Sequence, residues 1–239
     1  MCTFTYIPLA NNGFIMATNR DESTSRLAAL IPSLYLKDNF CIYFPQDPHG
    51  KGTWIATSQY YTLCLLNGGK AKHEKKSFYK KSRGLVLLEI LIGLLKGEIS
   101  PENTIDIKGI EPFTLFIVQH QPNALYKWVY SEDESMEISE LANDKPHIHS
   151  STTLYDEATS KLRAEWFEDF LEKSQDSEFS KLVDFHSHTN ADNKEFGLRI
   201  DRKGITKTLS LSGVEYTNNH KMHHIDFITN FASELECIF

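Results

Sequence analysis

Cys2 combines a nucleophile with a terminal position in the chain. Methionine aminopeptidases remove Met1 when the second residue is small, and cysteine is small enough. Processing would leave a thiol beside its own free α-amine, a nucleophile with a built-in base. A free thiol with a pKa of about 8.5 is only about 3% thiolate at pH 7. A guanidinium that lowered this pKa by about 1.5 units would make roughly half of it thiolate. The alternative is a second-residue cysteine with no chemical role.

A polar tetrapeptide, Asn19-Arg20-Asp21-Glu22, could supply that guanidinium. It closes a strand predicted over 14–18, and an Asn-Asn-Gly turn separates this strand from one predicted over 3–7. A hairpin would therefore bring the tetrapeptide beside the chain start. There Arg20 would stabilise a thiolate and Asp21 would orient the α-amine. The alternative is a solvated polar turn.

The elements that must position these residues come in blocks. Apolar periodicity and turn signals predict strands over 3–7, 14–18, 40–44, 53–56, 61–66, 113–119, 125–130, 205–211, 214–217 and 222–227. They also predict three helices: one over 83–96, one that is capped by Asp156 and continues through Leu171, and one over 179–185. Strands, helix, strands, helix and strands in this order fit an α+β fold with helices packed on antiparallel sheets. A chain of 239 residues can form one domain over 1–239.

Composition excludes several classes of function. The formal net charge of −7 disfavours general affinity for nucleic acid or anionic membranes. Four scattered cysteines form neither a disulfide framework nor a zinc motif. The longest apolar stretch is too short to span a membrane, and the start lacks the features of a signal peptide. We therefore expect a cytoplasmic protein with reduced thiols and no cofactor.

The start MCTF and the later NRDE resemble the NRDE family, whose eukaryotic members are transport and Golgi organisation proteins. The resemblance covers nearly the whole chain, and its further matches are Gly52-Thr53-Trp54-Ile55-Ala56, Leu65-Leu66-Asn67, Ser82-Arg83-Gly84, Ser150 to Tyr155, Arg163, Trp166-Phe167 and Thr208-Leu209-Ser210. It implies a four-layer αββα sandwich of the N-terminal-nucleophile hydrolase type. Such folds are similar to choloylglycine hydrolases and penicillin V acylases, which cleave non-peptide amides with an N-terminal cysteine.

By this resemblance Cys2 is the nucleophile, flanked by Arg20 and Asp21, and Asn67 is an oxyanion-hole donor. Two departures from the acylases stand out. Arg20 and Asp21 are adjacent here, whereas the acylases separate the two residues by two positions. The acylases also carry a second asparagine in mid-chain, where some relatives have Ser-Asn and this chain has Ser150-Ser151. The hydroxyl of Ser151 can donate one hydrogen bond in place of that amide, with a shorter reach.

Substrate contacts are expected from Trp54, Arg83 and Ser151, although Trp54 also suits the core. The basic run from Lys70 to Arg83 is typical of a solvated loop, or it borders a pocket for an anionic or amphipathic small molecule. Paired histidines occur at His147/His149, His186/His188 and His220/His223/His224. No cysteine or carboxylate accompanies them at regular ligand spacing, so we expect structural histidines and no metal.

Two functions follow. The first is a hydrolase of linear, non-peptide amide C–N bonds. The second is a non-catalytic carrier of haem or lipid on the same fold, because the eukaryotic relatives are linked to haem and lipid homeostasis. Paired histidines would favour haem.

Overall fold

The computed structural model describes residues 3–103, 107–174, 178–190 and 192–239. Strands of this part of the chain form two seven-stranded sheets, and every pairing within them is antiparallel. The predicted α+β class, with helices on antiparallel sheets, is confirmed.

The first sheet has the order β10-β1-β2-β12-β13-β14, with β11 paired to β12. Its strands are β1 (Thr3–Pro8), β2 (Phe14–Ser23), β10 (His147–Ser150), β11 (Asp201–Arg202), β12 (Thr206–Tyr216), β13 (His220–Asp226) and β14 (Phe231–Glu236). The second sheet follows the chain order from β3 to β9. It contains β3 (Leu30–Lys37), β4 (Phe40–Gln46), β5 (Ile55–Thr57), β6 (Tyr61–Asn67), β7 (Phe113–Gln119), β8 (Ala124–Tyr130) and β9 (Met136–Leu141).

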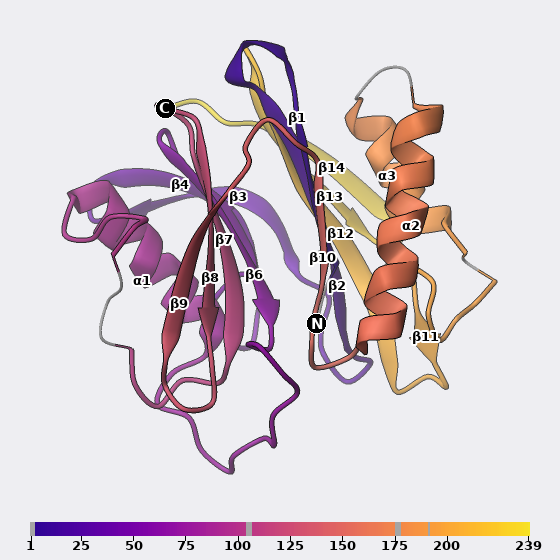
Figure 1. Cartoon of the computed structure of the whole chain (residues 1–239). Coiled ribbons are helices and arrows are strands. Elements are labelled where there is room, and N and C mark those ends of the chain that lie inside the picture. The colour runs from indigo at the N-terminus through magenta and orange to yellow at the C-terminus, as the bar shows by residue number, and fades with distance from the viewer. Residues whose placement is uncertain (1–2, 104–106, 175–177, 191) are drawn as a thin grey trace.

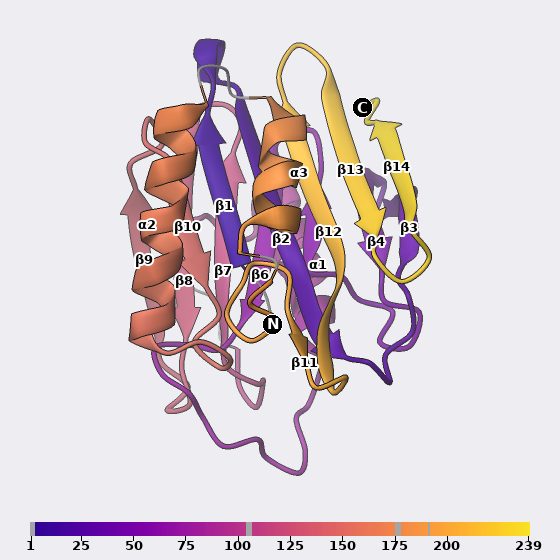
Figure 2. The same ribbon diagram turned by 90° about the vertical axis from the view of Figure 1, so that its right-hand side faces the viewer.

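Helices cover the outer faces of the two sheets (Figure 1). They are α1 (Arg83–Lys96), α2 (Glu157–Lys173) and α3 (Phe179–His188), and a short 3₁₀ turn spans Ala10–Asn12. One apolar cluster lies between α1 and the second sheet, another between the two sheets, and a third between the first sheet and the pair α2 and α3. The first sheet, with α2 and α3 in front of it, is seen face-on in Figure 2.

Local signals in the sequence explain the helices. The predicted helix 83–96 has the bounds of α1, and Gly97 ends it in the left-handed conformation with φ of 69°. Asp156 caps α2 as predicted, because its Oδ1 accepts a hydrogen bond from Thr159 N at 2.8 Å. The shorter helix predicted at 179–185 extends to His188.

The strands differ more from the prediction. The two-residue β11 and the strands β3, β9, β10 and β14 were not predicted, and each of the latter four is an edge strand of its sheet. An edge strand buries few of its side chains, so its apolar pattern is weak. The ranges predicted at 205–211 and 214–217 are one strand, β12, which runs on through Gly213. A Cβ at Gly213 would lie 2.3 Å from the Phe179 ring, so glycine there makes room for α3.

None of the described helices is long and apolar enough to cross a membrane.

Candidate functional site

Strand β2 divides the NRDE tetrapeptide between two environments. Phe14 and Met16 point into the cluster between the sheets, whereas Ile15 and Ala17 point into the cluster under α2 and α3. Because side chains alternate along a strand, Arg20 continues the face between the sheets and Asp21 continues the helix-side face. The two predicted catalytic residues therefore lie on opposite sides of one strand.

Arg20 is held from two directions on its side of the strand. Its Nη2 donates to Asp47 Oδ2 at 2.8 Å, and its guanidinium carbon lies 4.8 Å from the centre of the Trp54 ring. The backbone N–H groups of His49 and Gly50 fix the other carboxylate oxygen of Asp47. Burial favours the neutral acid, but these N–H groups and the charge of Arg20 hold the pKa of Asp47 below its usual value. Arg20 is 4% exposed, and its Nη1 has no hydrogen-bond partner among the described residues.

A pocket of about 450 Å³ opens beside Arg20. Four of the predicted site residues line it: Arg20, Trp54, Asn67 and Arg83. Trp54 is also 7% exposed and packs in the cluster between the sheets, so it serves both as core and as pocket wall. Part of the basic segment 70–83 borders the same pocket.

Glu22 carries a negative charge into this basic pocket. Burial would raise its pKa, yet the positive charges of Arg20, Arg26 and Arg83 lower the pKa below its usual value. Glu22 is therefore ionised at neutral pH and offsets part of the positive charge there.

Arg83 reaches the pocket because two glycines let the chain approach itself. A Cβ on Gly52 would lie 2.4 Å from the carbonyl carbon of Gly84, and Thr53 N donates to Gly84 O at 3.2 Å. The GTW and SRG segments thus meet where α1 begins. The Nη2 of Arg83 pairs with Glu111 Oε2 at 3.1 Å, which holds the side chain at the pocket.

Asn67 ends β6, where a contact with the other sheet fixes its backbone. Ser151 Oγ donates to Asn67 O at 2.5 Å and also lies 2.9 Å from Thr153 Oγ1. The Asn67 side chain makes no hydrogen bond to the described residues and lines the pocket, as an oxyanion donor must. Ser151 is 1% exposed and does not line this pocket, and its contact is with the backbone of Asn67, which does.

Asp21 is fully buried on the helix side of β2. It accepts hydrogen bonds from Tyr155 OH at 2.7 Å and from Thr208 Oγ1 at 2.6 Å. Burial raises the pKa of Asp21, although these two hydrogen bonds and the charge of Arg163 oppose the rise. Sequence reasoning gave no role to Tyr155, Thr208 or Asp47. Only the cross-strand register and loop geometry bring them to the site.

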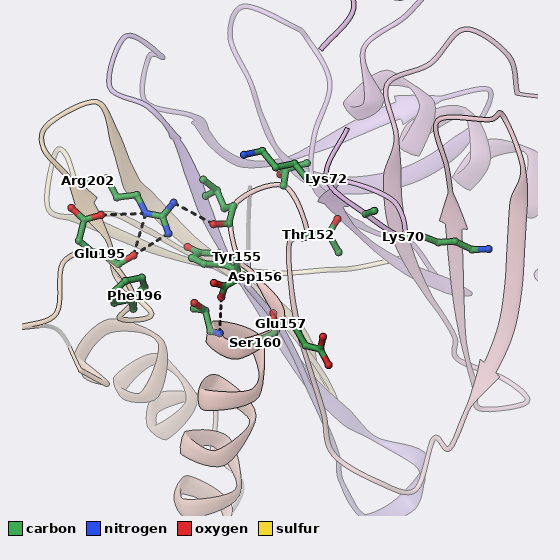
Figure 3. Close-up of a pocket in the computed structure, with 14 residues that line it drawn as sticks. Lys70, Lys72, Thr152, Tyr155, Asp156, Glu157, Ser160, Glu195, Phe196 and Arg202 are labelled. Carbon is green, nitrogen blue, oxygen red and sulfur yellow. Dashed lines mark hydrogen bonds and ion pairs between the residues drawn. The ribbon is translucent and has the colours of Figure 1, made fainter. Parts of the chain in front are cut away.

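A larger pocket of about 810 Å³, which Tyr155 helps to line, lies at the start of α2 (Figure 3). Arg202 borders it and donates from Nε and Nη2 to Glu195 O, at 3.1 and 3.0 Å. Tyr155 is the lining residue that reaches inward to Asp21.

The proposed nucleophile, Cys2, lies outside the described residues. The described chain begins at Thr3, whose Oγ1 accepts a hydrogen bond from Arg163 Nη1 at 2.6 Å. Arg163 therefore contacts the residue that follows Cys2 in the sequence.

The paired histidines have partners within the protein. Their contacts are His147 Nε2 with Ala142 O, His149 with the Phe116 ring, His186 Nε2 with Thr5 Oγ1, His188 Nδ1 with Asp184, His220 Nε2 with Thr57 Oγ1, His223 with Glu215 and Glu234, and His224 Nδ1 with Ser212 Oγ. Across residues 3–103, 107–174, 178–190 and 192–239, no group of three or more potential metal ligands converges.

A model of the family described as transport and Golgi organisation 2 matches residues 1–231. The chain belongs to this family. Comparison with curated protein sequences found no significant match.

Comparison with solved structures shows which proteins this chain resembles in fold. It is similar to the Caenorhabditis elegans ortholog of N-acylethanolamine-hydrolyzing acid amidase, with a TM-score of 0.56 and 10% identity over 89% of this chain and 92% of that one. It is also similar to the C2A mutant of a conjugated bile acid hydrolase from Clostridium perfringens, with a TM-score of 0.55 and 11% identity over 99% and 92% of the two chains. The chain therefore shares its fold with these two hydrolases.

Proposed function

We propose that the chain is a hydrolase of linear, non-peptide amides that uses Cys2 as its nucleophile after Met1 is removed. In this proposal residues 1–239 are one domain, a four-layer αββα sandwich of the N-terminal-nucleophile type. The observation that carries the proposal is the pocket beside Arg20. Arg20 and Asn67 both line it, and neither Nη1 of Arg20 nor the Asn67 side chain has a hydrogen-bond partner among the described residues.

The charges of the pocket suit a cysteine nucleophile. Arg20 contributes a permanent positive charge, and a thiolate is stabilised by such a charge. Asp47 orients the guanidinium, since it pairs with Nη2, and the buried Nη1 has no hydrogen-bond partner among the described residues. Asp21, on the other face of β2, is assigned to orienting the α-amine of Cys2.

The reaction then takes two steps. The Cys2 sulfur attacks the amide carbonyl carbon, and Asn67 with a backbone N–H stabilises the oxyanion. The C–N bond breaks as the α-amine passes the thiol proton to the leaving amine, which leaves a thioester. Water, deprotonated by the α-amine, attacks the thioester. A carboxylic acid departs and the thiol is restored.

The substrate we propose is a small anionic or amphipathic amide. Lys75, Lys81 and Arg83 border the pocket together with apolar surface from Phe78 and Trp54. Such a lining suits a molecule with an acyl portion and a negative group. We assign the reaction to the cytoplasm, where the thiols of the chain stay reduced.

The carrier alternative draws less support from the site. A haem ligand must offer a free imidazole nitrogen. Nε2 of His186 and of His220 each contact a threonine hydroxyl. Nδ1 of His186 has no hydrogen-bond partner among the described residues, but this side chain is fully buried and lines neither pocket, so it offers no open position to a haem iron.

Trapping of an acyl-enzyme tests the proposal. The mature protein, shown by intact mass to lack Met1, is incubated with a p-nitrophenyl ester of a medium-chain fatty acid, and the mass is read again. We expect one acyl adduct that maps to Cys2 and decays with time, and we expect no such adduct anywhere in Cys2→Ala. Acylation that is equal in both proteins would contradict the proposal.

A further inference from the structure

Arg163 is a buried cation that makes no hydrogen bond to a carboxylate of the described residues. It projects from α2 and is fully buried. Its Nε and Nη2 donate to Phe196 O at 3.1 Å each, Nη2 also donates to Gly197 O at 2.6 Å, and Nη1 donates to Thr3 Oγ1 at 2.6 Å. All these acceptors are neutral. A buried charge in such a setting needs compensation close by.

Tyr155 connects that cation to a buried anion. The guanidinium carbon of Arg163 lies 3.6 Å from the centre of the Tyr155 ring, and the hydroxyl of the same tyrosine donates to Asp21 Oδ2. Arg202 lies over the ring as well, at 5.2 Å, on the pocket of Figure 3. Thr208 completes the arrangement by donating to Asp21 Oδ1. Tyr155 thus contacts Arg163 through its ring and Asp21 through its hydroxyl.

The two ends of this network meet strands that neighbour the chain start. At one end Arg163 contacts Thr3, the first described residue of β1. At the other end Asp21 lies on β2, which pairs with β1 through Phe4↔Thr18 and the following positions. The network therefore fixes both the residue after Cys2 and the carboxylate assigned to its α-amine.

We propose that Arg163 and Tyr155 are positioning residues that hold the N-terminal nucleophile in its reactive place, through Thr3 and Asp21 respectively. This inference rests on the proposed function. Neither side chain lines the pocket beside Arg20, so both act through other residues. Arginine suits the task because its planar fork reaches three acceptor residues at once, which the single ammonium of a lysine cannot.

The test is the pH profile of Cys2 alkylation by iodoacetamide in protein that lacks Met1. Tyr155→Phe keeps the ring that the Arg163 and Arg202 guanidinium groups contact and removes the hydroxyl from Asp21. Thr3→Val keeps the shape of the side chain and removes the acceptor for Arg163. In each variant we expect the profile to move to higher pH, with alkylation at pH 6.5 slowed about threefold or more. That factor corresponds to a rise of about half a unit in the thiol pKa.

Tyr43→Phe is the matched control. Its hydroxyl donates to Ile238 O at 2.8 Å, and the side chain is 4% exposed, but it lies away from this network. We expect Tyr43→Phe to lower the melting temperature and leave the alkylation profile unchanged. Profiles identical to the parent in both Tyr155→Phe and Thr3→Val would overturn the positioning roles alone. A parent Cys2 that reacts no faster than a model peptide would overturn the proposed function and the positioning roles with it.

Discussion

At the scale of single residues, the proposed function depends on which groups contact the Arg20 guanidinium. Asp47 takes one nitrogen of the guanidinium and the Trp54 ring takes its face, while Nη1 stays unpaired among the described residues. A buried N–H without an acceptor lowers the stability of the fold unless a substrate or reacting group supplies the acceptor. A thiolate or an oxyanion would be such an acceptor.

Replacing Arg20 tests the role of its charge. Arg20→Met retains much of the packing against Trp54 and removes the charge, so the Cys2 thiol pKa should rise by about one unit. We expect alkylation of Cys2 at pH 6.5 to slow about tenfold. Arg199→Met is the control, because Arg199 lies over the Phe227 ring and does not line the pocket. An equal effect of both substitutions would show that Arg20 has no special role.

Ser151 supports the site through the backbone. Ser151→Ala removes the donor to Asn67 O and leaves that carbonyl without its side-chain partner. We expect a loss of about 1–2 kcal/mol in the free energy of unfolding, measured by urea denaturation. Acylation by an activated ester should also slow, since Asn67 is displaced. A variant as stable and as active as the parent would contradict the positioning of Asn67.

At the scale of elements, the approach of Gly52 to the start of α1 shapes the pocket. A Cβ at Gly52 has backbone atoms of Gly84 and Leu85 within 2.4 to 2.8 Å, which cannot yield as a flexible side chain can. Gly52→Ala should therefore cost about 1–3 kcal/mol of unfolding free energy. Gly50→Ala is the matched control in the same loop, because its nearest neighbour would be 3.7 Å away. We expect a change within about 0.5 kcal/mol there. Equal stabilities of the two variants would contradict this close approach.

The sequence predicts elements well where the signal is local. The cap at Asp156, the stop at Gly97 and the apolar run of α1 all depend on neighbours along the chain. Edge strands such as β3 and β14 escape because most of their side chains are exposed or half-buried, which leaves a weak apolar pattern, although each forms a hairpin with a neighbouring strand in sequence. The site divides in the same way. Arg20 and Asn67 stand out through motifs, whereas the pairing of Arg20 with Asp47 depends on tertiary structure.

At the scale of the whole molecule, buried histidines make stability depend on pH. Burial lowers the pKa of His120 and His224 to about 4, and the pKa of His149, His186 and His220 to about 3. These histidines are neutral in the folded state, while the unfolded chain binds protons below about pH 6.5. Stability is therefore full above that pH and falls as pH drops toward the folded-state values. Each histidine contributes up to about 1.4 kcal/mol per pH unit in this window.

Urea denaturation at pH 7.5 and pH 5.0 measures this dependence. We expect a clearly lower midpoint at pH 5.0, and a smaller difference in His186→Gln. His188→Gln is the control, because His188 is 72% exposed at its side chain and should leave the pH dependence as it is. A midpoint that is equal at both pH values would show that these histidines are solvated.

The most direct test of the whole account is the relative reactivity of the four cysteines. Burial raises the pKa of Cys237 to about 12, and Cys64 is fully buried, so neither should react readily. In protein shown by intact mass to lack Met1, mass-resolved labelling with iodoacetamide at pH 6.5 gives a rate for each thiol. If Cys2 is the nucleophile, we expect it to be labelled at least about tenfold faster than Cys41, Cys64 or Cys237, and faster than a model peptide thiol. A Cys2 rate equal to that of the model peptide would contradict this role.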